Sequence, residues 1–159
     1  MTEPHTTESP IPTIEITRVL DAPLELVWRV WTDPVHAKEW WGPHGFTTPL
    51  YESDLRTGGI MRYHMQAPDG TVYPNEGRYE EVVPHERIVV VGEVEIAGNV
   101  AFTARTDVRF REASGRTTVT IRQTYANVTA IGRNAIEGAP IGWAQQLERY
   151  EAYLHAHMT

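Results

Sequence analysis

The hydrophobic and polar positions of this chain follow two periods. Residues 14–20 alternate as in a half-buried strand, and the same period of two recurs from Phe46 to Tyr125. Glycine, proline, asparagine and aspartate interrupt this second stretch where hairpin turns are expected, and we expect a bulge at Gly77. The pattern predicts further strands near residues 50–55, 60–66, 72–83, 87–96, 100–110 and 116–125.

Helical periodicity appears in three places. Residues 24–34 (LELVWRVWTDP) and 35–41 (VHAKEWW) predict two short helices, the first with its N-cap near Asp21 or Ala22. Near the C-terminus, apolar residues recur at steps of three and four over residues 142–158, which predicts an amphipathic helix of about five turns. Residues 127–138 are compatible with a loop or with a partly helical lead-in.

This order of elements predicts an α+β fold. We expect a curved antiparallel sheet of about six to seven strands, wrapped around the long C-terminal helix, with two short helices after the first strand. The space between sheet and helix is either filled by side chains or forms a pocket. The Pro-, Thr-, Ser- and Glu-containing start predicts a disordered tail over residues 1–12, followed by a single domain over residues 13–159.

Composition and charge exclude several kinds of function. The chain has no cysteine, so disulfides, thiolate nucleophiles and cysteine-ligated metals are excluded. A formal net charge of −7 repels nucleic acid and anionic lipid. No apolar run approaches the about 18 residues that cross a membrane, and the start has no signal-peptide pattern. We therefore expect a cytoplasmic protein that binds neither nucleic acid nor membranes.

The most basic segment does not change this expectation. Arg105, Asp107, Arg109 and Arg111 alternate along one predicted strand, so their side chains share one face. Because an acidic residue interrupts the arginines, we interpret this face as a solvated outer surface of the sheet.

No motif for catalysis or metal binding stands out. None of the three serines lies in a G-x-S-x-G sequence, and no phosphate-binding glycine loop follows a strand. The seven histidines show no H-E-x-x-H or His-x-His spacing away from the chain ends. We predict no catalytic residues, no metal and no cofactor.

Several longer motifs carry a family resemblance. In order and content they resemble the Hsp90-ATPase-activator-homologue-like branch of the START/Bet v 1-like (SRPBCC) superfamily, which has the helix-grip fold. The motifs are RVLDAPLELVWRVWTDP (18–34), EWWGPHGFTTP (39–49), DLRTGGIMRYHMQAPDG (54–70), EGRYEEVVPHERIV (76–89) and GWAQQLERYEAYL (142–154).

The resemblance implies a cavity between the sheet and the C-terminal helix that binds an apolar or amphipathic small molecule. Methionine and aromatic side chains on the inward strand and helix faces are typical of such a wall. The candidate ligand-binding residues are Trp31, Trp41, Phe46, Met61, Tyr63, Met65, Tyr79, Phe102, Val119, Ile121, Gln123, Tyr125, Trp143, Leu147 and Tyr150.

Two alternative functions come from other classes. The family's name refers to a cochaperone, so a chaperone is an alternative partner; that cochaperone has a further N-terminal half, which these 159 residues do not match. Related cavities host cyclases and dehydratases of polyketide type. The acid–base candidates for such an activity would be Tyr63, Tyr79, Gln123 and Tyr125, with Arg122 or Glu81 as further candidates. Exposed strand edges are compatible with a homodimer as well as a monomer.

The segment EWWGPHGF, residues 39–46, is the most unusual local sequence. Adjacent tryptophans at a helix end point to different sides, so we expect one of Trp40 and Trp41 in the core and the other near the cavity. Gly42, Pro43 and Gly45 would then allow a sharp turn into the next strand. We interpret the segment as a structural corner and a candidate lid of the pocket.

Overall fold

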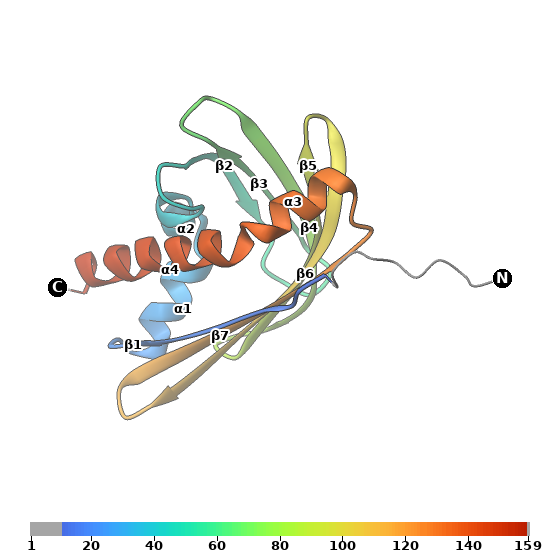
Figure 1. The fold of residues 1–159 in the computed structure, drawn as a ribbon. Coiled ribbons are helices and arrows are strands. Elements are labelled where there is room, and N and C mark those ends of the chain that lie inside the picture. Colours follow the sequence, from blue (N-terminus) through green and yellow to red (C-terminus); the bar gives the residue numbers. More distant parts are fainter. Residues whose placement is uncertain (1–10, 159) are drawn as a thin grey trace.

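A seven-stranded antiparallel sheet forms the body of the protein. The computed structural model describes residues 11–158, so the first ten residues of the predicted tail lie outside the described part. The strand order is β1-β7-β6-β5-β4-β3-β2, and the sheet curls strongly around the helices (Figure 1). The strands are β1 (Ile14–Leu20), β2 (Thr47–Ser53), β3 (Ile60–Gln66), β4 (Val72–Val83), β5 (Arg87–Ile96), β6 (Asn99–Ala113) and β7 (Arg116–Ala126).

Four helices are present in the described residues, and the longest lies across the open side of the sheet (Figure 1). They are α1 (Leu24–Thr32), α2 (Pro34–Trp40), α3 (Ala130–Glu137) and α4 (Ala139–Ala156). This arrangement confirms the predicted α+β helix-grip fold. None of the four helices is both long and apolar enough to cross a membrane.

The region that the sequence left open, residues 127–138, contains α3. Thr129 is the N-cap of this helix: its side-chain oxygen accepts a hydrogen bond from the backbone N–H of Gly132 at 3.1 Å. The same hydroxyl donates to the carbonyl oxygen of Ala101 on β6 at 3.0 Å. One threonine therefore both starts α3 and attaches it to the sheet.

Local details differ from the sequence expectations at two bulges and one helix start. Gly77 pairs in register with Gly92, so the predicted bulge there is wrong; the irregularity lies between Tyr79 and Glu81. A second register shift occurs in β2, which begins at Thr47 rather than at residue 50. Helix α1 has Pro23 as its N-cap.

The core between the sheet and the helices is strongly aromatic. The ring centroids of Trp40 and Tyr150 are 4.6 Å apart, and Trp31 lies 5.0 Å from Trp40 and 5.1 Å from Tyr150. Tyr150 is fully buried and its hydroxyl donates to the carbonyl oxygen of Val27 at 2.8 Å. Because these rings come from α1, α2 and α4, they fix the three helices against one another.

Helix α4 also holds the loop that joins α2 to β2. The side-chain carbonyl oxygen of Gln146 accepts from the backbone N–H of Gly42 at 3.0 Å, and that of Gln145 accepts from His44 at 3.1 Å. The Arg149 guanidinium donates to five backbone carbonyl oxygens at 3.0 to 3.2 Å, namely those of Glu39, Trp41, Gly42, Pro43 and Phe46.

This contact explains the segment EWWGPHGF. Gly42 has a φ of +97°, a conformation that side-chain-bearing residues rarely adopt, so the turn requires glycine there. Trp40 and Trp41 are both buried, and the indole N–H of Trp40 donates to the carbonyl oxygen of Val30 at 3.1 Å. The segment is a structural corner, and side chains of α4 hold its backbone in place.

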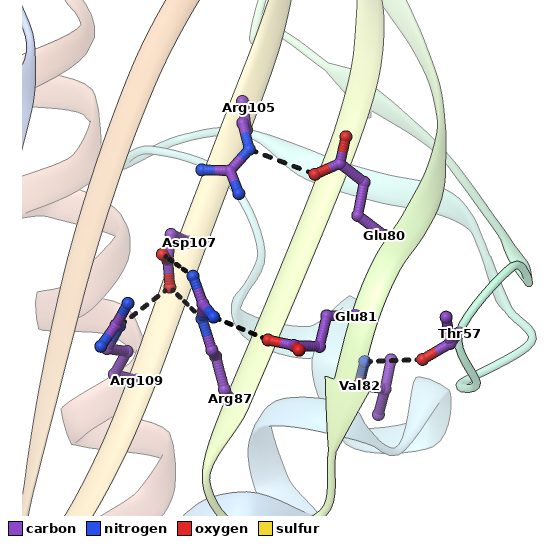
Figure 2. Close-up of polar contacts among 8 residues, drawn as sticks. All are labelled: Thr57, Glu80, Glu81, Val82, Arg87, Arg105, Asp107 and Arg109. Atoms are coloured by element: carbon purple, nitrogen blue, oxygen red, sulfur yellow. Dashed lines mark hydrogen bonds and ion pairs between the residues drawn. The ribbon is translucent and has the colours of Figure 1, made fainter.

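The outer face of the sheet carries ion pairs across neighbouring strands (Figure 2). Asp107 on β6 accepts from Arg87 at 2.7 Å and from Arg109 at 3.4 Å, while Arg87 also bonds Glu81 at 2.7 Å. Only 8% of Asp107 is exposed, so the predicted fully solvated face is wrong at this position. The flanking arginines cover the carboxylate, and the acids neutralise the arginines of the face.

We predict that Arg149→Met lowers the free energy of unfolding by about 2–4 kcal/mol, because several buried or half-buried carbonyl oxygens lose a charged donor. Urea denaturation would measure this. Arg78→Met is the control, since Arg78 is exposed and bonds one carbonyl oxygen, that of Gly58 at 2.9 Å. Equal effects of the two substitutions would contradict the special role of Arg149.

A second prediction concerns Asp107. Burial opposes its ionisation, but hydrogen bonds from Arg87 and Arg109 outweigh this, so the pKa of Asp107 is lowered. Its contribution to stability is therefore present above the unfolded pKa of about 3.9 and is lost as the pH falls through the lowered folded value. Asp107→Asn should cost about 1–3 kcal/mol at neutral pH.

The difference in the free energy of unfolding between wild type and Asp107→Asn should shrink below about pH 4. Denaturation curves recorded from pH 7 to pH 2 would measure it. Asp21→Asn is the control, because Asp21 is 82% exposed and 3.9 Å from Arg116. A difference that stays constant with pH would show that ionisation of Asp107 does not contribute.

Candidate functional site

A cavity of about 630 Å³ lies between the concave face of the sheet and helices α3 and α4. Strands β2 to β7 supply its floor and walls, α1 and the loop after α2 close one end, and α3 with the first turns of α4 borders the other. A volume of this size is typical of a small-molecule site.

The space exists because α4 stands away from the middle of the sheet. Its main contacts are with β1, α1, α2 and α3. Below it, Gly77 and Gly92 pair directly and both line the cavity, so two adjacent inward positions carry no side chain. A Cβ atom on Gly92 would lie 2.7 Å from the carbonyl oxygen of Glu76, so the close approach of the strands requires glycine.

Aromatic side chains dominate the end of the cavity near α2. The ring of Trp41 lies 5.4 Å from those of both Tyr51 and Tyr63, and the two tyrosines stack at 6.0 Å. Burial raises the pKa of Tyr63 to about 12 and raises that of Tyr51 as well. Both hydroxyls therefore stay protonated at neutral pH and are neutral hydrogen-bonding groups.

A satisfied polar network occupies another part of the wall. Gln123 on β7 donates to the hydroxyl of Thr106 at 2.8 Å. Its side-chain oxygen accepts from the indole N–H of Trp143 at 3.1 Å and from the hydroxyl of Tyr125 at 2.5 Å. The network links β6 and β7 to α4, and its internal bonds use most of the hydrogen-bonding capacity of Gln123.

A separate polar contact lies at the β2–β4 side of the cavity. The hydroxyls of Ser53 and Tyr79 are 2.6 Å apart. Burial raises the pKa of Tyr79, partly offset by this hydrogen bond, so the pair is neutral too.

The structure places many of the candidate residues in the cavity lining: Trp31, Trp41, Phe46, Met61, Tyr63, Met65, Tyr79, Phe102, Gln123 and Trp143. The remaining candidates lie outside the lining. Val119, Ile121, Leu147 and Tyr150 are buried in the core, where α1 and α4 meet the sheet. Tyr125 packs edge-on against Phe102 at 5.3 Å and bonds Gln123. Whether any of these residues binds a ligand stays a prediction.

Sequence reasoning missed Tyr51, Tyr73, Asn75 and Gln146, all of which line the cavity. Tyr51 follows the register shift in β2, where simple alternation cannot assign the face. Tyr73 and Asn75 share the inward face with Gly77 and Tyr79 because no bulge occurs at Gly77. Continuing the alternation of β4 without a bulge would have found them, whereas the inward polar Gln146 gives no local signal.

Histidines do not gather at the cavity. His44 pairs with Glu148 at 3.1 Å on the surface, and His36 bonds the hydroxyl of Tyr153 at 2.8 Å between α2 and α4. Within residues 11–158, no group of three or more His, Cys, Asp or Glu side chains is arranged to hold a metal ion.

These features define the class of the protein as a helix-grip domain with an internal, mainly apolar cavity. The sequence matches the family described as Activator of Hsp90 ATPase homolog 1-like protein over residues 21–155. The chain belongs to this family, which confirms the resemblance of its motifs. A comparison with curated proteins found no match.

Solved structures of similar proteins agree with this assignment. A crystal structure of a protein from Chromobacterium violaceum is 30% identical, with a TM-score of 0.74 over 89% of this chain and 96% of that one. One from Nitrosomonas europaea is 26% identical, with a TM-score of 0.75 over 91% and 94%. A solution structure of an Arthrobacter aurescens protein, 22% identical with a TM-score of 0.80 over 92% and 88%, shares the fold.

We predict that Trp41→Ala lowers the free energy of unfolding by about 3–5 kcal/mol, because a buried ring that packs on Trp40 and Tyr63 is replaced by empty space. Thermal and urea denaturation would measure this. Trp143→Ala is the control: Trp143 also lines the cavity but is only half-buried, so its replacement should lower the free energy of unfolding less. An unchanged melting temperature in Trp41→Ala would show that Trp41 has no structural role.

Proposed function

We propose that this protein is a cytosolic small-molecule-binding protein whose ligand is neutral and mainly apolar or aromatic. The observation that carries the proposal is the cavity of about 630 Å³, whose mainly apolar wall includes several aromatic side chains together with Met61 and Met65. Burial of a ligand against such a wall is favourable through the hydrophobic effect, and a few polar side chains suffice to orient it.

The absence of cationic groups from the cavity supports a neutral ligand. No Lys, Arg or His side chain occurs among the described residues that line it. The two charged lining residues are Glu76 and Glu93, and the Glu76 carboxylate pairs with Arg62 at 3.3 Å. A carboxylate or phosphate group of a ligand would lose its hydration without gaining a counter-charge, which is costly. Fatty acid anions are therefore poor candidates.

Gly142 offers a test that separates binding from folding. It lines the cavity on α4, and a Cβ atom added there would meet no heavy atom within 4 Å. We predict that Gly142→Phe weakens binding of fluorene, a neutral aromatic probe, about tenfold or more, because the new ring takes up cavity space. Stability should stay unchanged or rise by up to about 0.5 kcal/mol, since glycine is a poor helix former.

Quenching of the cavity tryptophans Trp31, Trp41 and Trp143 by fluorene would measure binding. Ile141→Phe is the matched control: it adds the same ring one residue earlier, where the side chain is 66% exposed, and should leave binding unchanged. Failure of the wild type to bind fluorene, or equal binding by all three proteins, would count against the proposed function.

Contact with a chaperone of the Hsp90 type is a second candidate, favoured by the description of the matching family. Such contact would use the protein surface and would therefore be insensitive to Gly142→Phe. Stimulation of a purified Hsp90 ATPase by the wild type and by Gly142→Phe to the same extent would support this function. No stimulation and no co-sedimentation with Hsp90 at low salt would exclude it.

A further inference from the structure

One polar group in the cavity wall lacks a partner. Gln146 is on α4, lines the cavity and is 6% exposed. Its side-chain nitrogen, Nε2, is the single buried side-chain nitrogen or oxygen without a hydrogen-bond partner in the part of the chain that the structure describes. Neighbouring polar side chains of the wall, such as Gln123 and Tyr79, are bonded within the protein.

The orientation of the Gln146 amide is set by its surroundings. Its oxygen, Oε1, lies 3.0 Å from the backbone N–H of Gly42. A backbone N–H is always a donor, so the atom facing it must be the acceptor oxygen and not the amide nitrogen. Nε2, which has two N–H donors, is thereby turned away from the loop.

Leaving a buried donor unpaired is costly, and natural structures tend to avoid it. An apolar residue of the same shape, such as methionine, would avoid that cost at Nε2. The bond to Gly42 accounts for an acceptor at position 146 but not for the two donors beside it. A group that enters the cavity and accepts a hydrogen bond would account for both halves of the amide.

We propose that the Gln146 amide is the anchoring donor of the cavity and that the ligand is a neutral aromatic or apolar molecule bearing a carbonyl oxygen; this rests on the proposed function. Gln146 lies between Trp143, one turn earlier on the same helix, and the loop residue Trp41, both of which line the cavity. The ligand carbonyl accepts from Nε2 while its rings lie against the tryptophans.

Bond formation requires a small movement of the side chain, because Nε2 is buried within the wall. The terminal torsion of glutamine is broad, so the amide can tilt while Oε1 keeps its contact with Gly42. The backbone of the loop does not need to move, since Arg149 holds it independently.

A matched pair of probes tests the anchor. Fluorene and 9-fluorenone have the same tricyclic frame, and only the ketone has an acceptor oxygen. The measured quantity is the ratio of their dissociation constants in each protein, which removes the difference in hydrophobicity between the probes. We expect this ratio to favour 9-fluorenone about five- to tenfold more in the wild type than in Gln146→Met.

Two further variants separate the anchor from the stability of the loop. Gln145→Met removes the neighbouring contact to the loop, the 3.1 Å bond to His44, and should keep the wild-type ratio. Gln146→Glu, measured at pH 9, keeps an acceptor for Gly42 and replaces the donor by an oxygen. It should lose the preference for the ketone, and it provides the test if Gln146→Met does not fold.

Nuclear magnetic resonance gives a direct readout. The side-chain NH₂ signals of ¹⁵N-labelled Gln146 should shift on addition of 9-fluorenone and shift less with fluorene. If wild type and Gln146 variants bind both probes with the same ratio, the anchor is wrong and the proposed function stands. If the wild type binds neither probe, both proposals are overturned.

Discussion

The contact between Arg149 and the carbonyl oxygens of the α2–β2 loop determines how the helices sit on the sheet. One guanidinium reaches five carbonyl oxygens between Glu39 and Phe46, and thereby ties the middle of α4 to the entrance of β2. Tyr150, the next residue of α4, packs its ring against Trp31 of α1 and Trp40 of α2 and so fixes the same turn of the helix. With α4 held at this end, its first turns can cross the sheet without packing on it, and this leaves the cavity.

Most of the fold could be predicted from the sequence because it follows from local alternation. Met61, Tyr63 and Met65 share one face of a regular strand, and that face is the cavity wall. The sequence did not reveal on which side of the sheet a residue lies where a bulge interrupts the strand, as before Tyr51. It also did not reveal contacts between residues far apart in the chain. Asp107 is buried by arginines on its own and a neighbouring strand, and no local pattern reveals this. Likewise, the roles of Arg149 and Gln146 come from a loop about a hundred residues away.

Apart from Glu76 and Glu93, the charged residues of the described part of the chain lie outside the cavity lining. Ion pairs between strands lie on the outer face of the sheet: Arg87 on β5 pairs with Asp107 on β6, and Arg105 on β6 reaches across β5 to Glu80 on β4 (Figure 2). On the inner face the polar groups are tyrosine, asparagine, glutamine and threonine side chains, and burial keeps the tyrosines protonated. Alternation of side chains along each strand makes this division possible, since successive residues face opposite sides. The result is a mainly uncharged cavity wall in a protein of net charge −7.

The same residues support the fold and border the cavity, so stability and binding are physically coupled. Trp41 packs on Trp40 in the core and on Tyr63 in the cavity wall, while Gln146 bonds the loop through Oε1 and also lines the cavity. A ligand that binds only the folded chain stabilises it, by an amount that rises with the logarithm of the ligand concentration above Kd. In the proposed complex, a ligand that pairs with Nε2 would also remove the cost of leaving this buried donor unpaired. The proposed anchor would thus let the cavity discriminate between apolar molecules of similar size by whether they carry a hydrogen-bond acceptor.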